Sequence, residues 1–187
     1  GYPKLLPIMQ FKKATQTVRY LLCLLILAAC SAPEKNDKLG SIYFDVTGSK
    51  EAVKHFEEGL LLLHSFEFDD AATAFIEAQK IDSTMAMAYW GEAMTYNHPL
   101  WAEQSYEEAK TALNKLSDSP EARVEKSSTE IEKDFMKAVN ILYGEGSKYD
   151  RDVAYSEFMA KVYEKYPKSQ EAAAFYALSL LGSVPVG

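Results

Sequence analysis

Cysteine is scarce in this sequence, because Cys23 and Cys30 are its only two among 187 residues. Both lie near the N-terminus, where we expect the first to be removed and the second to be modified. No disulfide framework is therefore predicted, and the stability of the remaining chain must come from packing. A long apolar run is missing too, because Tyr20–Leu27 is far shorter than the roughly 20 residues that a membrane-spanning helix needs.

The signatures of common enzyme classes are also absent. The chain has no Gly-rich phosphate loop, no HExxH zinc motif and no GxSxG nucleophile elbow. Adjacent acidic residues such as Glu57 and Glu58 are interpreted as solvated helix faces. Basic residues are outnumbered by acidic ones, 20 against 27, which gives a net charge of −7. This balance argues against nucleic acid as a partner and against electrostatic attachment to anionic lipids.

The N-terminal residues have the pattern of an export signal. Basic residues within 12–19 precede the apolar run Tyr20–Leu27, and two alanines separate that run from Cys30. A basic region, a short apolar region and small residues before a cleavage point are typical of a secretory signal peptide. We therefore predict that residues 1–29 are a leader whose signal peptide starts near Met9.

The residues Leu27-Ala28-Ala29-Cys30 resemble the lipobox of bacterial lipoproteins. The resemblance implies that the Cys30 thiol receives a diacylglyceryl group and that cleavage leaves Cys30 as the new N-terminus. A thiolate is a suitable nucleophile for alkylation, and several acyl chains hold a protein on a bilayer where one would not. Because Ser31 follows, the resemblance favours the outer membrane, facing the periplasm. The alternative is an ordinary cleaved signal with an incidental cysteine.

Residues 30–49 are mostly polar and show little periodicity, so we interpret them as a tether next to the lipid anchor. Residues 42–46 interrupt this polar stretch with Ile, Tyr, Phe and Val. They are a candidate for a short extended piece that docks on the first helix.

Helical spacing of apolar residues begins at Glu51 and continues toward the C-terminus. It predicts an all-α domain over residues 50–187, with no convincing strand alternation. Pro99 and Pro167 end helices, and Pro120 suits the first turn of another segment. About seven helices are expected, at residues 50–64, 69–81, 84–97, 103–116, 128–143, 150–165 and 169–181.

Small and aromatic residues recur in this domain at a fixed step. Ala71, Phe75 and Ala78 follow the small Gly59, and Ala93 stands one step after Gly59. Residues 52–85 thereby resemble one full tetratricopeptide repeat, a helix–turn–helix unit of about 34 residues. The resemblance implies a right-handed solenoid of antiparallel helix hairpins, in which small residues allow helices to approach closely.

The resemblance weakens along the chain. The second repeat, 86–118, is degenerate in its second helix, and further helices follow over 121–182. The chain ends on an apolar helix without the polar capping helix that repeat stacks need. We interpret the sequence as an N-terminal fragment of a longer array. The alternative is that a dimer partner covers the last helix.

The resemblance also implies where a ligand would bind, because the first helix of each tetratricopeptide hairpin lines the concave face. The implied groove is apolar and aromatic with Asn and His at its end, which suits a peptide or apolar ligand. The alternative is that a neighbouring segment, such as 42–46, fills this face as core. The groove positions are Phe56, Leu60, Leu63, His64, Trp90, Met94, Asn97 and His98.

The resulting hypothesis is a non-enzymatic scaffold in the bacterial cell envelope that binds a protein or peptide and needs no cofactor or metal. The alternative is a metal-dependent binder or enzyme that uses the His64/His98 end of the groove. A zinc site needs three or four ligands, and spacing supplies only these two. A third possibility is that the array only positions a further C-terminal domain.

Overall fold

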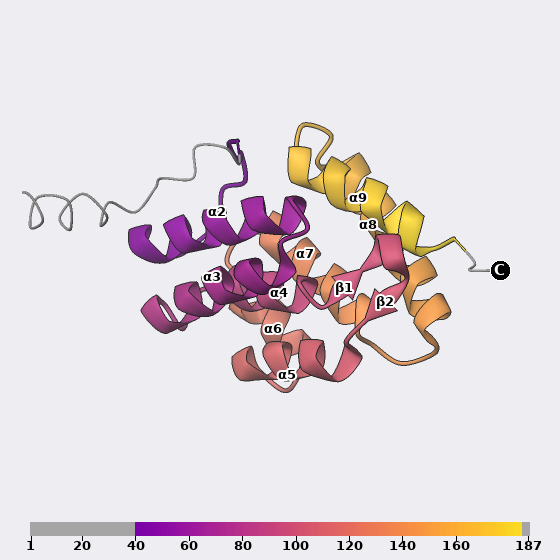
Figure 1. Ribbon diagram of the computed structural model, residues 1–187, viewed down its shortest axis with the longest axis horizontal. Coiled ribbons are helices and arrows are strands. Elements are labelled where there is room, and N and C mark those ends of the chain that lie inside the picture. Colours follow the sequence, from indigo (N-terminus) through magenta and orange to yellow (C-terminus); the bar gives the residue numbers. More distant parts are fainter. Residues whose placement is uncertain (1–39, 185–187) are drawn as a thin grey trace, which may run out of the picture. The chain divides into compact units, whose positions relative to one another are not determined.

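The computed structural model describes residues 40–184, and this part of the chain is all-α with eight helices in sequence (Figure 1). The predicted leader 1–29, the lipidation site Cys30 and residues 30–39 of the tether lie outside the described residues. None of the described helices is both long and apolar enough to span a bilayer. The helices are α2 (Lys50–His64), α3 (Phe68–Ile81), α4 (Ala86–Met94), α5 (Tyr106–Leu116), α6 (Pro120–Lys126), α7 (Glu130–Leu142), α8 (Lys148–Lys165) and α9 (Gln170–Gly182).

The all-α prediction is confirmed for the described residues, with two local corrections. The first is the short helix α6, which the sequence pattern indicated only through Pro120. The second is the segment between α4 and α5. The helices predicted at 84–97 and 103–116 were too long at these ends, because this segment forms a small hairpin. Its antiparallel strands are β1 (Asn97–His98) and β2 (Glu103–Gln104), joined by the 3-10 turn η1 (Pro99–Trp101).

Most helices begin at a serine or threonine whose side chain accepts a hydrogen bond from the first turn. Such a cap satisfies one of the backbone N–H groups that a helix leaves unpaired at its start. At α7 the arrangement is a full capping box, in which the Glu132 side chain also accepts from the Thr129 backbone. The capping residues are Ser49, Ser119, Thr129, Ser147 and Ser169.

Consecutive helices pack against each other, and the tightest approach is at Phe75 of α3. Its ring lies between the backbones of Gly59 in α2 and Gly91 in α4. A Cβ atom added at Gly59 would stand 2.9 Å from the ring, and one added at Gly91 would stand closer still. Ala71 and Ala78, on either side of Phe75, are fully buried. Small residues therefore allow three successive helices to close around one ring.

Packed aromatic rings form the centre of the core and join elements that are distant in sequence. Trp90 of α4 contacts Phe135 of α7 and Phe175 of α9, with ring centroids 5.5 and 5.1 Å apart. Phe44, before α2, lies 5.0 Å from Phe135 and 6.3 Å from Phe56. The expectation that 42–46 docks on the first helix is thus confirmed at Phe44. Helix α4 is buried at every position, which places it in the middle of the domain (Figure 1).

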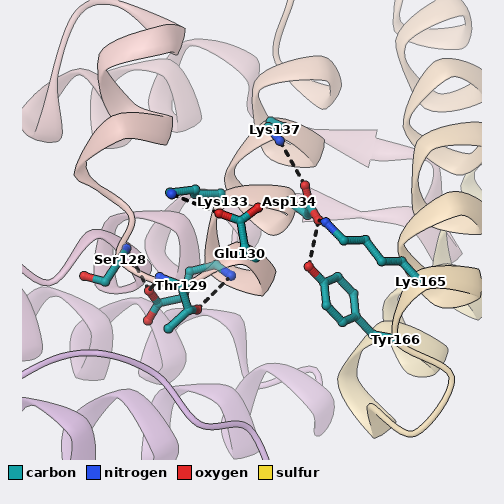
Figure 2. Close-up of polar contacts among 9 residues, drawn as sticks. Ser128, Thr129, Glu130, Lys133, Asp134, Lys137, Lys165 and Tyr166 are labelled. Carbon is teal, nitrogen blue, oxygen red and sulfur yellow. Dashed lines mark hydrogen bonds and ion pairs between the residues drawn. The ribbon is translucent and has the colours of Figure 1, made fainter.

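Two buried carboxylates on α7 connect it to neighbouring segments (Figure 2). Glu132 accepts hydrogen bonds from the backbone of Ser128 and Thr129 and from that of Thr47, before α2. Asp134 accepts from Lys137, and on its other side from Lys165 at 2.6 Å and from the Tyr166 hydroxyl at 2.9 Å. Each buried charge is thereby compensated, as stability requires.

Burial raises the pKa of Asp134, but hydrogen bonds from Lys165, Lys137 and Tyr166 together outweigh burial and leave the pKa below its ordinary value. The hydrogen bond that Lys165 donates to Asp134 also raises the pKa of Lys165. The ionised carboxylate is therefore the form that the fold stabilises.

We expect Gly91→Ala to destabilise the domain, although alanine is the better helix former by about 1 kcal/mol. The added methyl group would meet the enclosed Phe75 ring, and overpacking of this kind costs about 1–3 kcal/mol. Urea denaturation would measure the change. Phe75→Leu in the same chain should recover part of the loss, by a coupling of more than about 0.5 kcal/mol. A Gly91→Ala protein as stable as the parent would contradict the close contact.

We expect Asp134→Asn to lower the free energy of unfolding by about 1–3 kcal/mol at pH 7, because the variant loses charged hydrogen bonds in a buried position. The pKa of Asp134 is depressed in the fold, so its contribution is present above the unfolded pKa of about 3.9 and is lost as pH falls through the folded pKa. The parent and variant should therefore converge toward pH 3 in denaturant titrations. Glu130→Gln, at an exposed ion pair, is the control and should change stability much less.

Candidate functional site

Three of the eight predicted groove positions lie deepest in the core. Phe56 and Leu60 of α2 are fully buried, and Trp90 of α4 is 1% exposed. Phe44, Phe135 and Phe175 cover them, so in this structure these three side chains present no surface to a ligand. The alternative of a filled face, raised from the sequence for residues 42–46, applies at this position. The contributions of α7 and α9 had no counterpart in the sequence pattern.

Four other positions, at or just after the C-terminal ends of α2 and α4, lie around a small cavity. Leu63, His64, Met94 and Asn97 line it together with residues of α7, α8 and α9. Its volume is about 30 Å³, enough for one or two water molecules. Whether these four residues bind a ligand stays a prediction. The further lining residues are Phe66, Phe68, Pro99, Leu142, Asp152, Tyr155, Phe175, Leu178, Ser179 and Gly182.

Most polar groups around this cavity have partners within the protein. His64 Nε2 lies 2.7 Å from a carboxylate oxygen of the buried Glu171 on α9. The Asn97 side-chain oxygen accepts from Gln104, and Asp152 accepts from Lys148 at 2.6 Å. These contacts give His64 and Asn97 a structural role in joining segments.

Tyr155 differs, because its hydroxyl makes no hydrogen bond with any other residue among 40–184. Burial raises the pKa of Tyr155 well above its ordinary value of 10. A tyrosine hydroxyl is protonated at neutral pH even at its ordinary pKa, and Tyr155 lines the cavity. A water molecule is the partner that fits the available volume.

His64 and His98 have separate surroundings. The His98 ring stacks on Phe68 with centroids 3.9 Å apart, and its Nε2 lies 2.9 Å from the Thr95 carbonyl oxygen. His64 instead contacts Glu171 and Phe175. Within residues 40–184, no group of three or more His, Cys, Asp or Glu side chains is close enough together to hold a metal ion.

Sequence reasoning missed a group of rings beside the cavity, where the turn between α2 and α3 meets the small hairpin. Trp101 packs edge-on against Phe66 and Phe68, at centroid distances of 5.8 and 6.2 Å. His98 stacks on Phe68 and also lies edge-on to Trp101, with ring centroids 6.5 Å apart. We call Phe66, Phe68, His98 and Trp101 the aromatic cluster. Phe66 is 40% exposed and Trp101 is 56% exposed, so the cluster presents ring surface to solvent.

The backbone and a buried arginine hold the aromatic cluster in place. Phe66 and Ala102 both have positive φ angles, 61° and 54°, which non-glycine residues rarely adopt. The Arg151 guanidinium donates to the Leu142 carbonyl at 3.0 Å and to the Gln104 side chain at 2.7 Å. Strand β2 is thereby fixed to α7 and α8, and η1 also packs on α9. The hairpin that carries Trp101 is therefore held by contacts with several helices, and Phe66 lies in the adjoining turn.

No protein-family model, no curated protein and no solved structure matches this chain. A function must therefore be inferred from the residues and their geometry. Of the surfaces described above, the aromatic cluster is distinguished by exposure and rigidity together. Its sequence signal was weak, because Phe66 lies in a turn, Phe68 is the first residue of α3, and Trp101 comes just after Pro99.

Proposed function

We propose that this protein is a lipid-anchored, tetratricopeptide-like scaffold of the bacterial envelope that binds a partner protein through the aromatic cluster. The observation that carries this proposal is the exposure of Trp101, on a hairpin fixed from several sides, and of Phe66, in the adjoining turn before α3. Exposed aromatic side chains on a rigid support are typical of the residues that dominate protein–protein binding energy.

The packing around Phe75 supports the tetratricopeptide-like part of the proposal. The resemblance expects a small residue in the first helix and Ala, Phe and Ala in the second. Gly59 is that small residue, and its backbone contacts the Phe75 ring. Successive helices also contact one another in chain order over much of the domain. The proposal moves the binding surface from the filled concave face to the loop end of the hairpins.

A binding role without catalysis agrees with the chemistry around the cavity. His64 contacts Glu171, Asp152 accepts from Lys148, and burial raises the pKa of Tyr155 further above neutral pH. None of these groups is a free base beside a nucleophile, which acid–base or covalent catalysis needs. A cavity of about 30 Å³ also leaves no room for a substrate larger than a few atoms.

Site-specific photo-crosslinking in the native host tests the binding surface. A benzophenone amino acid at position 101 should give a discrete adduct with one envelope protein. The same label at Tyr149 or Tyr43, which are 51% and 73% exposed, provides matched controls away from the aromatic cluster. With the purified partner, Trp101→Ala should weaken binding at least about tenfold. Absence of adducts at 101, or equal adducts at all three positions, would overturn the proposal.

Lipid anchoring is tested separately at Cys30. The resemblance to the lipobox implies that the parent incorporates radiolabelled palmitate and fractionates with the outer membrane. Cys30→Ala should lose the label and should accumulate as unprocessed precursor, because the acylated thiol is gone. Equal labelling of the variant would refute the anchor. This result would leave the binding surface untouched.

A further inference from the structure

Carboxylates border the aromatic cluster on several sides. Glu67, Asp69 and Asp70 line a surface hollow of about 420 Å³ together with Phe66, Phe68 and His98. Glu103 is on strand β2, and its carboxylate lies 3.8 Å from His98 Nδ1. All four carboxylates are exposed. Ring faces and negative charge therefore meet at one place on the surface.

These four carboxylates differ from the buried acidic residues because no lysine or arginine is paired with them. Within residues 40–184, no lysine or arginine lies within 4 Å of Glu67, Asp69, Asp70 or Glu103. In contrast, Glu92, Asp134 and Asp152 each bind a lysine at 2.6 Å. Negative charge at the aromatic cluster is left available to a binding partner.

The start of α3 accounts for only part of this negative charge. Glu67 is its N-cap residue, and Asp69 and Asp70 are in its first turn, where carboxylates offset the positive end of the helix macrodipole. That end is equivalent to roughly half a positive charge, against three carboxylates. A surplus of negative charge therefore remains beside the rings.

We propose that the partner supplies a basic peptide segment, with an arginine or lysine side chain lying over Trp101 and Phe66 and further basic residues facing Glu67, Asp69, Asp70 and Glu103. This inference rests on the proposed binding function and names its chemistry. A ring face attracts a cation through its quadrupole, and nearby carboxylates add to that attraction. Trp101 and Phe66 are 56% and 40% exposed, which leaves part of their surface open to a partner.

The open shape of the site favours a segment with several charges over a single small cation. An exposed cation–π contact improves affinity only about two- to fivefold, and each exposed ion pair adds a similar factor. A lone small cation would therefore bind very weakly. A peptide that engages several carboxylates at once sums these contributions.

The test uses the full chain and a fluorescein-labelled hexa-arginine peptide, with binding followed by fluorescence anisotropy. We expect binding that weakens with added salt, and no binding of hexa-glutamine or hexa-glutamate peptides. Trp101→Leu keeps an apolar side chain but removes the ring, and should weaken binding at least about threefold. Trp101→Phe retains a ring and should keep most of the affinity. Asp69→Asn with Asp70→Asn should weaken binding at least about fivefold.

The matched charge control is Glu57→Gln with Glu58→Gln, which removes the same charge from an adjacent exposed pair on α2. This control should bind within about twofold of the parent. An equal loss in the control and in the Asp69/Asp70 variant would overturn the proposal, because binding would then follow net charge. Unchanged binding of Trp101→Leu would overturn it too. Circular dichroism melting verifies that each variant is folded.

Other outcomes separate this inference from the proposed function. Trp101-dependent binding of phosphatidylcholine vesicles without binding of the peptide would assign the aromatic cluster to a lipid headgroup and overturn the peptide. Photo-crosslinks at position 101 together with no peptide binding would retain the scaffold function and reject the basic segment. If neither photo-crosslinks at position 101 nor peptide binding were observed, both the scaffold function and the basic segment would be rejected.

Discussion

The contact of the Phe75 ring with the backbones of Gly59 and Gly91 is the constraint on which the first three helices depend. A side chain at either glycine would enter the space of that ring, so the spacing of α2, α3 and α4 is set where they meet. This spacing places the ends of α2 and α4 next to each other. The turn after α2 and the hairpin after α4 can then bring Phe66, Phe68, His98 and Trp101 together.

The aromatic core determines which face of the hairpins remains available. Trp90 lies within contact distance of Phe56, Phe135 and Phe175, and these rings come from α2, α7 and α9. Helices α7 and α9 cover the inner sides of α2 and α4, while the outer side of α2 is exposed and the C-terminal ends of α2 and α4 border the small cavity. The small cavity and the aromatic cluster both lie near the C-terminal ends of α2 and α4. Phe66 and Phe68 belong to the cluster and also line the cavity. Closure of the inner face and exposure of the loop end are two results of one packing arrangement.

Local sequence features predicted much of the helical structure, and the misses share a cause. Helix α2 was predicted with its observed bounds, because Ser49 caps it and its apolar stripe is regular. The hairpin at 97–104 was missed because a contact from Arg151, 47 residues further on, holds it. The burial of Phe56 and Trp90 depends on distant residues too, since the 34-residue spacing of the sequence relates these two positions but says nothing of Phe175. The aromatic cluster combines two distant loops, and no spacing rule connects them.

The hydrogen bond from the Thr47 amide to Glu132 spans 85 residues of sequence. Together with the contact between the Phe44 and Phe135 rings, this hydrogen bond attaches the segment that precedes α2 directly to α7. A pulling force applied to the segment before α2 would therefore act on α7 before it could separate α2 from α3. The domain would resist traction as one unit, a useful property for any protein held at its N-terminal end while a partner moves.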